Sequence, residues 1–138
     1  MIQYPVVTMK VIEVAAGLIG RDGRYLIARR KPGVHLGGFW EFPGGKRESG
    51  ESLEECLHRE LWEELNIRIH APVPFQVVRH EYPEKIVELH FFRCRIESGD
   101  AIALDCAELR WVYPHEMAAF EFPSADQAVI AALQQGEV

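Results

Sequence analysis

The stretch from residue 45 to residue 67 reads GKRESGESLEECLHRELWEELNI and carries the strongest structural signal in the chain. Within it, the same residue type recurs at every fourth position, at Leu53, Leu57, Leu61 and Leu65. This spacing places the four side chains on one face of an α-helix. We therefore predict an amphipathic helix that ends near Leu65 and turns this leucine stripe towards the core.

Both ends of this predicted helix carry residues that favour helix termini. Ser49 and Ser52 are plausible N-caps, because a serine hydroxyl accepts a hydrogen bond from a free amide of the first turn. Asn66 follows the last leucine and readily adopts the left-handed conformation that ends many helices. Trp62 is expected on the side facing away from the helix glutamates, with packing as its role.

The same helix is crowded with acidic residues, since seven of the 21 Asp and Glu residues lie between residues 48 and 64. A solvent-exposed face is the simpler interpretation of a glutamate-rich helix. The spacing favours another, because Glu60, Glu63 and Glu64 stand at i, i+3 and i+4 and share one side. Carboxylates so close repel one another unless a cation lies among them, and hard divalent cations prefer oxygen ligands. We predict a metal-binding face here.

Outside the helix, the sequence predicts short strands that alternate with turns. Apolar segments at 11–19 and 25–28 flank a turn at 21–24 and are expected to form a hairpin. A loop rich in Gly and Pro follows, and a turn is expected at the two glycines 44 and 45. Further strands are predicted at 67–70, 75–80, 86–95 and 109–112, with a short helical turn at 114–119 and a final helix at 125–135.

Length and composition limit the kind of protein. The chain has 138 residues, 48% of them apolar and 26% charged, and a formal net charge of −6. These values fit one domain over residues 1–138 and exclude a collagen, a coiled coil or a disordered tail. The acidic balance argues against stable binding to duplex nucleic acid, which needs an excess of Lys and Arg.

Cysteine content and hydropathy indicate the compartment. Cys56, Cys94 and Cys106 form no CxxC pair, so we expect reduced thiols in a cytoplasmic protein. The sequence contains no uncharged apolar run of about 18 residues, and nothing in it suggests secretion or a membrane span.

The helix and its flanks match a known pattern. Gly45, Glu51 and the run Arg59-Glu60-Leu61-Trp62-Glu63-Glu64-Leu65-Asn66-Ile67 resemble the signature box of the Nudix hydrolases. Eight of the nine fixed positions match over 23 residues, and the departure is Asn66 where the family has Gly. Asn is the residue best able to replace Gly at a helix C-terminus.

This resemblance implies both a fold and a chemistry. The fold would be the α/β Nudix fold, a mixed β-sheet sandwiched between α-helices. The activity would be hydrolysis of a nucleoside diphosphate linked to a further group, with Mg²⁺ as cofactor and Mn²⁺ as a substitute. The partner would be a small nucleotide, with no membrane and no duplex nucleic acid, and the chain would be a monomer or a homodimer.

The resemblance also assigns roles to individual residues. Glu60, Glu63 and Glu64 look like the metal ligands, and Gly44 would lend a backbone carbonyl to the same site. A further pair, Glu51 and Arg59, would brace the loop against the helix.

One more acidic residue is expected in the catalytic site. In the family it often stands six positions before a Trp, as Asp105 does before Trp111. Glu108 is a rival, and for either residue a plain surface carboxylate is the alternative.

Beyond the box, the resemblance covers roughly residues 10 to 133 and narrows to the MutT branch. The segments that carry it are Arg29-Arg30, Trp40-Glu41-Phe42-Pro43-Gly44-Gly45-Lys46 and Phe122-Pro123-Ser124-Ala125-Asp126. Members of this branch hydrolyse oxidised or otherwise modified nucleoside triphosphates to a monophosphate and pyrophosphate. The implied substrates are 8-oxo-dGTP or 5-substituted CTP and dCTP.

Asp126 bears on which base is bound. The 8-oxo-guanine enzymes of the branch have Asn at this position, whereas the enzymes that act on CTP resemble this chain in having Asp. An ionised Asp only accepts hydrogen bonds, while Asn also donates. An acceptor could take a proton from a cytosine amino group or from guanine N1 and N2, so both bases stay open.

Four further residues are predicted to bind substrate. Phe42 is a candidate to stack on or line the base pocket, with core packing as the alternative. Arg30 is a candidate to contact a phosphate or the base, with a surface salt bridge as the alternative. Lys46 belongs to a MutT-like segment, and Glu84 lies in the turn that corresponds to a substrate-lining loop. His90, by contrast, is expected to be structural.

Two other functions stay open from the sequence. The first keeps the chemistry and changes the substrate to ADP-ribose, another nucleotide sugar or a dinucleotide. The second is a nucleotide-binding module that does not catalyse. The three intact helix glutamates argue against it, because a binding module has no need to keep them together against their repulsion.

Overall fold

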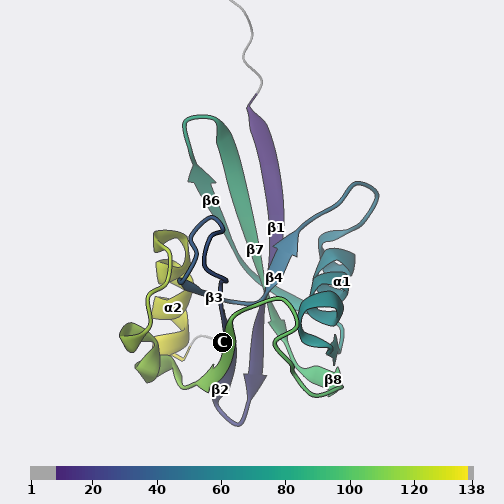
Figure 1. Cartoon of the computed structure of the whole chain (residues 1–138), viewed down its shortest axis with the longest axis vertical. Coiled ribbons are helices and arrows are strands. Elements are labelled where there is room, and N and C mark those ends of the chain that lie inside the picture. Colours follow the sequence, from purple (N-terminus) through teal and green to yellow (C-terminus); the bar gives the residue numbers. More distant parts are fainter. Residues whose placement is uncertain (1–8, 137–138) are drawn as a thin grey trace, which may run out of the picture.

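The computed structural model describes residues 9–136, and its centre is a mixed β-sheet (Figure 1). Within those residues, seven strands form one sheet in the order β3-β2-β1-β7-β6, with β4 also paired to β1 and β9 to β2. Its strands are β1 (Lys10–Arg21), β2 (Arg24–Arg29), β3 (Trp40–Glu41), β4 (Gly44–Lys46), β6 (Val73–Glu81), β7 (Lys85–Cys94) and β9 (Glu108–Val112). A separate pair consists of β5 (Arg68–Ile69) and β8 (Ile96–Ser98).

The sheet is mixed because its two central strands run parallel. β1 pairs with β7 from Lys10 opposite Lys85 to Ile19 opposite Cys94. The other pairings in this sheet, including that of β4 with β1, are antiparallel.

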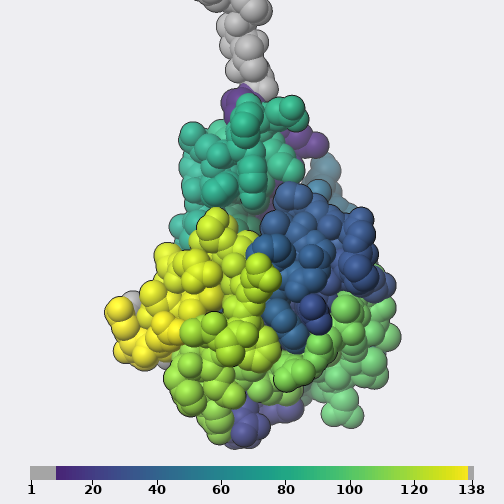
Figure 2. Space-filling model, turned by 60° about the vertical axis from the view of Figure 1, so that its left-hand side comes forward, coloured from purple at the N-terminus to yellow at the C-terminus, as the bar shows by residue number. Residues whose placement is uncertain are grey.

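Helices cover both faces of this sheet. α1 (Leu53–Leu65) lies on one face, while α2 (Gln127–Gln134) lies on the other with the 3-10 turns η1 (Pro114–Ala119) and η2 (Ser124–Asp126) (Figure 1). Figure 2 shows the loop between β2 and β3 against the segment that precedes α2, where the Trp40 amide donates to the Glu121 carbonyl at 2.8 Å.

Side-chain alternation along β1 divides the core into two parts. Ala15 and Ile19 pack in the cluster that contains the α1 leucines, whereas Ala16 and Leu18 pack in the cluster that contains the apolar residues of α2. This division follows from the strand geometry, since successive side chains point to opposite faces. The predicted α/β sandwich is confirmed.

The predicted hairpin is confirmed, and its turn has a clear physical cause. Asp22 and Gly23 have φ angles of 53° and 78°. Two successive residues at positive φ give the turn that matches the twist of antiparallel strands, and Asp-Gly is a favoured pair for it.

Both ends of α1 are capped. Ser52 is the N-cap rather than Ser49: its hydroxyl accepts from the Glu55 amide at 3.0 Å, and the Glu55 carboxylate accepts from the Ser52 amide at 2.9 Å. Asn66 ends the helix in the left-handed conformation, with φ 59° and ψ 35°, as predicted. Of the leucine stripe, Leu57, Leu61 and Leu65 are buried and Leu53 is partly buried.

Trp62 departs from its predicted packing role. Its side chain is 44% exposed, and the Arg68 guanidinium lies 4.1 Å from its ring centroid. The reason is angular, because one residue turns the helix by about 100° and carries position 62 off the leucine stripe. The ring is therefore covered by a cation at the surface instead of by the core.

Two predicted elements have different bounds. The strand expected at 67–70 shrinks to β5, where two residues pair with β8 across an irregular register. The helix expected at 125–135 begins as the 3-10 turn η2 and becomes α-helical over Gln127–Gln134.

Cys56, Cys94 and Cys106 are free, in agreement with the expected reduced thiols. Burial raises the pKa of the Cys94 thiol to about 12, which makes it unreactive at neutral pH. Among residues 9–136 no helix combines the length and apolar character needed to cross a membrane. Residues 1–8 and 137–138 of the predicted domain lie outside the described residues.

Candidate functional site

Glycines 44 and 45 lie in strand β4 and not in the turn expected there, and they let β4 approach both the sheet and the helix. Gly44 pairs with Ala16 and Gly45 with Ala15. A Cβ atom on Gly44 would collide with the Ala15 backbone, and one on Gly45 would collide with the Glu60 carboxyl group. Only glycine therefore allows the backbone of β4 to lie this close to the carboxylates of α1.

Arg59 ties the acidic side chains of this region together. Its guanidinium donates to both oxygens of Glu51, at 3.0 and 2.7 Å, and this fork geometry fixes the orientation of the guanidinium. The same group donates to Glu60 at 2.9 Å and to Glu63 at 3.3 Å. It also donates to the Lys46 carbonyl at 3.1 Å, which connects the helix to β4.

These contacts change the protonation of Glu51. Hydrogen bonds from Arg59, followed by the Glu48 amide, lower the pKa of Glu51 to about 2. Glu51 is therefore ionised at every pH at which the protein is expected to work.

Glu64 has the opposite environment. Burial is the largest cause that raises its pKa, and the neighbouring carboxylates of Glu60, Glu41 and Asp105 add to it, so that the pKa reaches about 9. Without a cation this carboxyl group holds its proton at neutral pH. With a divalent cation among these groups, the charged form would be favoured instead.

Glu63 is the most exposed of the three predicted ligands. Its side chain is 57% exposed, compared with 14% for Glu60, and it pairs with Arg59. The predicted triplet therefore lies on one side of α1, with Glu60 and Glu64 inside and Glu63 at the rim.

Glu41 belongs to this site and was not predicted from the sequence. Burial raises its pKa, and the Arg30 guanidinium, which donates to it at 3.0 Å, opposes this rise. Glu41 acts electrostatically on both Glu64 and Asp126 and so lies near both the helix glutamates and the predicted base-binding residue. A charged residue inside the apolar run Phe39–Phe42 was the available signal.

Arg30 makes the salt bridge that was its alternative role. Besides Glu41, it donates to the His35 carbonyl at 2.8 Å, so its side chain is held on both sides. This arrangement places a fixed cation beside the acidic group, where it can still meet an anionic ligand because its side chain is 32% exposed.

The two candidates for the additional acidic residue differ in their surroundings. Asp105 contributes to the raised pKa of Glu64 and pairs with Lys31 at 2.9 Å. Glu108 pairs instead with Arg110 at 2.8 Å, on β9. Asp105 is therefore the one that interacts electrostatically with the helix glutamates.

Asp126 and Phe42 both lie buried on the α2 side of the sheet. Asp126 is 6% exposed, and burial, with a smaller effect from Glu41, raises its pKa to about 7. The Phe42 ring packs against Phe122 and Phe91, with centroids 5.4 and 6.1 Å away, which is the core packing that the sequence left open.

Lys46 and Glu84 are exposed, and only Lys46 lies beside the acidic group. Lys46 follows the two glycines in β4, and its carbonyl bonds to Arg59. Glu84 lies in the turn between β6 and β7, at the end of a hairpin that extends away from α1 and α2 (Figure 1). The structure does not bring Glu84 to the other predicted residues.

A cleft of about 890 Å³ lies elsewhere, at the β1–β2 turn. Its lining includes Arg21, Tyr25, His70, Arg93 and Arg95. None of the residues predicted to bind substrate or metal lines it.

Comparisons with known proteins give the class. The family model of the NUDIX domain matches residues 14–132 of this chain. The 8-oxo-dGTP diphosphatase of Haemophilus influenzae is 34% identical over 122 residues, covering 88% of this chain and 90% of that protein. The CTP pyrophosphohydrolase of Escherichia coli is 38% identical over 126 residues, covering 90% and 92%.

The fold comparison agrees with the sequence comparison. The crystal structure of the MutT protein from Methanosarcina mazei Go1 matches with a TM-score of 0.82 at 26% identity, over 96% of this chain and 99% of that chain. The chain belongs to the NUDIX domain family, as its signature box predicted.

Nudix hydrolases generally use a divalent metal, and the donor atoms present suit one, although in residues 9–136 Glu60, Glu63 and Glu64 do not bring three ligand atoms within 4.8 Å of one another. The donor set beside Glu64 consists of oxygen atoms, which suits a hard cation. Besides burial, neighbouring carboxylates raise the pKa of Glu64, and a divalent cation would relieve this repulsion.

Proposed function

We propose that the chain is a MutT-like nucleoside triphosphate pyrophosphatase that depends on Mg²⁺. Its substrate is an oxidised or otherwise modified nucleoside triphosphate, such as 8-oxo-dGTP or 5-substituted CTP or dCTP. Water adds across a phosphoanhydride bond, and the products are the nucleoside monophosphate and pyrophosphate. The catalytic unit is one domain that works in the cytoplasm, as a monomer or a homodimer.

One observation carries this proposal. In a NUDIX domain, burial and then the neighbouring carboxylates of Glu60, Glu41 and Asp105 raise the pKa of Glu64 to about 9. Burying mutually repelling carboxylates destabilises a fold, so their gathering points to a ligand that compensates the charge. A divalent cation bound with a triphosphate is such a ligand.

Glu60, Glu63, Glu64 and the Gly44 carbonyl would hold the metal. When bound, Mg²⁺ lowers the pKa of an attacking water and neutralises phosphate oxygens, and Mn²⁺ can replace it because it accepts similar oxygen ligands. The protein's own contribution is positioning: Arg59, fixed by its two bonds to Glu51, holds Glu60 and Glu63 by hydrogen bonds of 2.9 and 3.3 Å.

Asp105 is proposed to accept the proton of the attacking water. Its electrostatic effect on Glu64 supports this role over Glu108, which is paired on β9. Lys31 pairs with Asp105 at 2.9 Å and so orients the carboxylate.

Asp126 is proposed to bind the base, with Arg30 and Lys46 as cations near the phosphates. Since the pKa of Asp126 is raised to about 7, both protonation forms are populated near neutral pH. The ionised form accepts a hydrogen bond, and the protonated form also donates one. The chemistry at this position therefore suits either a cytosine or a guanine derivative.

The test is a product assay with Mg²⁺ on 8-oxo-dGTP, dGTP, CTP, 5-methyl-dCTP and ADP-ribose. Monophosphate is resolved from diphosphate, and pyrophosphate from phosphate. We expect monophosphate and pyrophosphate in equal amounts, formed fastest from one modified triphosphate. Faster turnover of ADP-ribose than of every triphosphate would move the chain to the nucleotide-sugar hydrolases. Nucleotide binding without any product would leave a binding module.

A further inference from the structure

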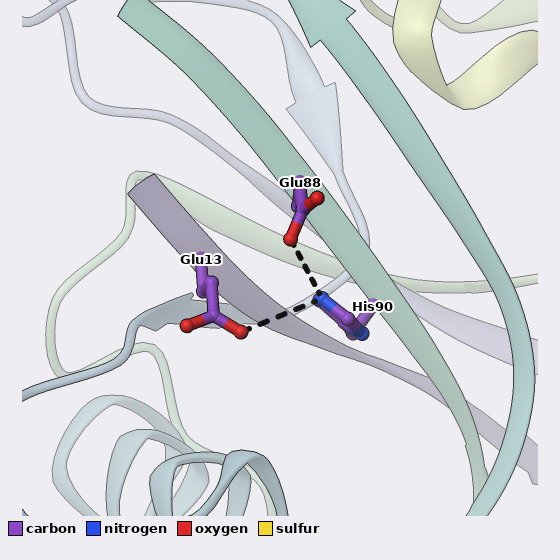
Figure 3. Close-up of side chains that lie close together, drawn as sticks. All are labelled: Glu13, Glu88 and His90. Carbon is purple, nitrogen blue, oxygen red and sulfur yellow. Dashed lines mark ion pairs between the residues drawn. The ribbon is translucent and has the colours of Figure 1, made fainter. Parts of the chain in front are cut away.

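A second group of possible metal ligands lies on the two parallel strands at the sheet centre (Figure 3). Glu13 of β1 stands directly opposite Glu88 of β7. His90 follows Glu88 by two residues and therefore points to the same face, the one that α1 covers further along the sheet. None of these three residues belongs to the α1 site.

The three side chains converge on one point. The Nε2 atom of His90 lies 3.8 Å from Oε2 of Glu13 and 3.7 Å from Oε1 of Glu88. Among residues 9–136, this is the one group of three His, Cys, Asp or Glu residues whose ligand atoms all lie within 4.8 Å of one another.

His90 Nε2 needs a partner that the described part of the chain does not supply. The atom is buried, and within residues 9–136 it makes no hydrogen bond. The carboxylate oxygens of Glu13 and Glu88 are too far from Nε2 for a hydrogen bond, because hydrogen bonds from nitrogen to oxygen span about 2.7 to 3.2 Å. A buried polar atom without a partner is destabilising, so an additional ligand at this point would be favourable.

Two arginines orient the carboxylates towards His90. Arg47 donates to Oε1 of Glu13 from Nε at 3.1 Å and pairs with it from Nη2 at 3.0 Å. Arg79 donates to Oε2 of Glu88 at 3.1 Å. In each carboxylate one oxygen is held by an arginine, and the other faces the imidazole. Supporting hydrogen bonds of this kind are what hold metal ligands in position.

We propose that Glu13, Glu88 and His90 bind a divalent transition-metal ion of the Zn²⁺ type, separate from the metal of the α1 site. Bonds of about 2.1 Å place two ligands at most about 4.2 Å apart, so the two distances from His90 fit a shared ion after small side-chain shifts. The imidazole selects for such an ion over Mg²⁺, and three protein ligands leave a position for water.

The ion would stabilise one end of the sheet and the loop that precedes α1. Arg47, which holds Glu13, also donates to the carbonyls of Glu48 at 3.4 Å and Glu51 at 3.1 Å. Fixing Glu13 on the ion therefore fixes Arg47 and, through it, this loop. The expected gain is a higher melting temperature in Zn²⁺.

The experiment uses the imidazole as a signature, because the α1 site contains no histidine among its proposed ligands. The full chain, labelled with ¹⁵N at histidine and kept in excess Mg²⁺ to fill the α1 site, is titrated with ZnCl₂ and followed by NMR of the ring nitrogens. We expect the His90 Nε2 resonance to shift on addition of about one equivalent, accompanied by a rise in melting temperature. His90→Gln identifies the resonance.

Matched variants locate the site by calorimetry under the same conditions. His90→Gln should raise the dissociation constant for Zn²⁺ by at least about tenfold. His115→Gln removes an exposed imidazole in η1 and should leave the constant unchanged.

Either of two results would overturn the proposal. The first is a His90 imidazole that titrates with pH but ignores Zn²⁺, which would make the group a pH-dependent ion pair. The second is Zn²⁺ binding of equal strength in the His90→Gln chain, which would place the ion elsewhere. If the His90→Gln chain does not fold, replacing the other five histidines in turn identifies the His90 resonance by exclusion.

Discussion

At the scale of single residues, Glu64 offers the most direct test of the α1 site. Glu64→Gln keeps the shape of the side chain and removes a ligand charge, so turnover should fall by about 10³-fold or more. Folding should survive, because the neutral amide has the shape of the protonated carboxyl group that Glu64 carries without a cation. Steady-state kinetics and circular dichroism measure the two effects.

Glu54→Gln is the matched control for that prediction. Glu54 lies in the first turn of the same helix, with its side chain exposed to solvent. Its replacement should leave turnover within about twofold, as is usual for surface positions. Near-normal turnover in Glu64→Gln would reject the metal assignment.

Asp126 should control base preference more than rate. Asp126→Asn supplies a permanent donor and acceptor in place of a group that titrates. We expect the ratio of kcat/KM for 8-oxo-dGTP to that for 5-methyl-dCTP to change by at least tenfold, which corresponds to about one altered hydrogen bond. If the relative kcat/KM values for the five substrates of the product assay are unchanged in Asp126→Asn, Asp126 does not contact the base.

The same residue should make stability depend on pH. Its pKa rises from 3.8 to about 7 on folding, so between these values the folded chain binds a proton that the unfolded chain lacks. The stabilising contribution is therefore complete below about pH 4 and is lost as the pH rises through about 7. Denaturant unfolding should show that Asp126→Asn is more stable than the parent at pH 8, by on the order of a few kcal/mol, and that the difference shrinks towards pH 4. A constant difference across this range would contradict the raised pKa.

At the scale of elements, the C-terminus of α1 explains why the family's glycine can be absent. Asn66 holds φ at 59°, a conformation that glycine adopts freely and alanine does not. Asn66→Gly should leave the free energy of unfolding within about 0.5 kcal/mol, whereas Asn66→Ala should lower it by about 1 kcal/mol. Urea titration distinguishes the two, and equal losses would mean that the backbone conformation is not what matters.

The helices and strands differ in how well the sequence predicts their bounds. Local signals were sufficient for α1, since the leucine stripe, Ser52 and Asn66 all lie within one segment. They were sufficient for the β1–β2 hairpin as well, where Asp22 and Gly23 mark the turn. The ends of β5 and α2 depend on which partner strand or helix is available, and this is decided by packing.

The residues of the candidate site also differ in whether the sequence alone could predict them. Glu51, Arg59 and Glu60 could be recognised because spacing along one helix and its preceding loop brings them together. Glu41 could not be recognised, because its position near both Glu64 and Asp126 depends on how the strands pair. The grouping of Glu13 with His90 likewise requires the register of β1 on β7, which no local pattern encodes.

At the scale of the whole molecule, activity and folding should respond differently to loss of metal. Both faces of the sheet carry apolar clusters that need no ion, so the fold should persist without one. Excess EDTA should lower turnover at least 10³-fold and leave the far-ultraviolet circular dichroism unchanged, and added Mg²⁺ should restore activity. Unfolding on chelation would instead give a bound metal a structural role, and refolding in Mg²⁺ alone would assign that role to the α1 site.

The parallel pairing of β1 with β7 has a consequence for how the chain acquires its shape. Lys10 lies opposite Lys85, so the innermost strand meets one of its two main neighbours only after most of the polypeptide exists. Contacts between such distant segments slow folding, because a long loop must close before they form. On the ribosome, this edge of β1 therefore waits for β7 to be synthesised, and a nascent chain that stops before β7 leaves the edge without a partner strand.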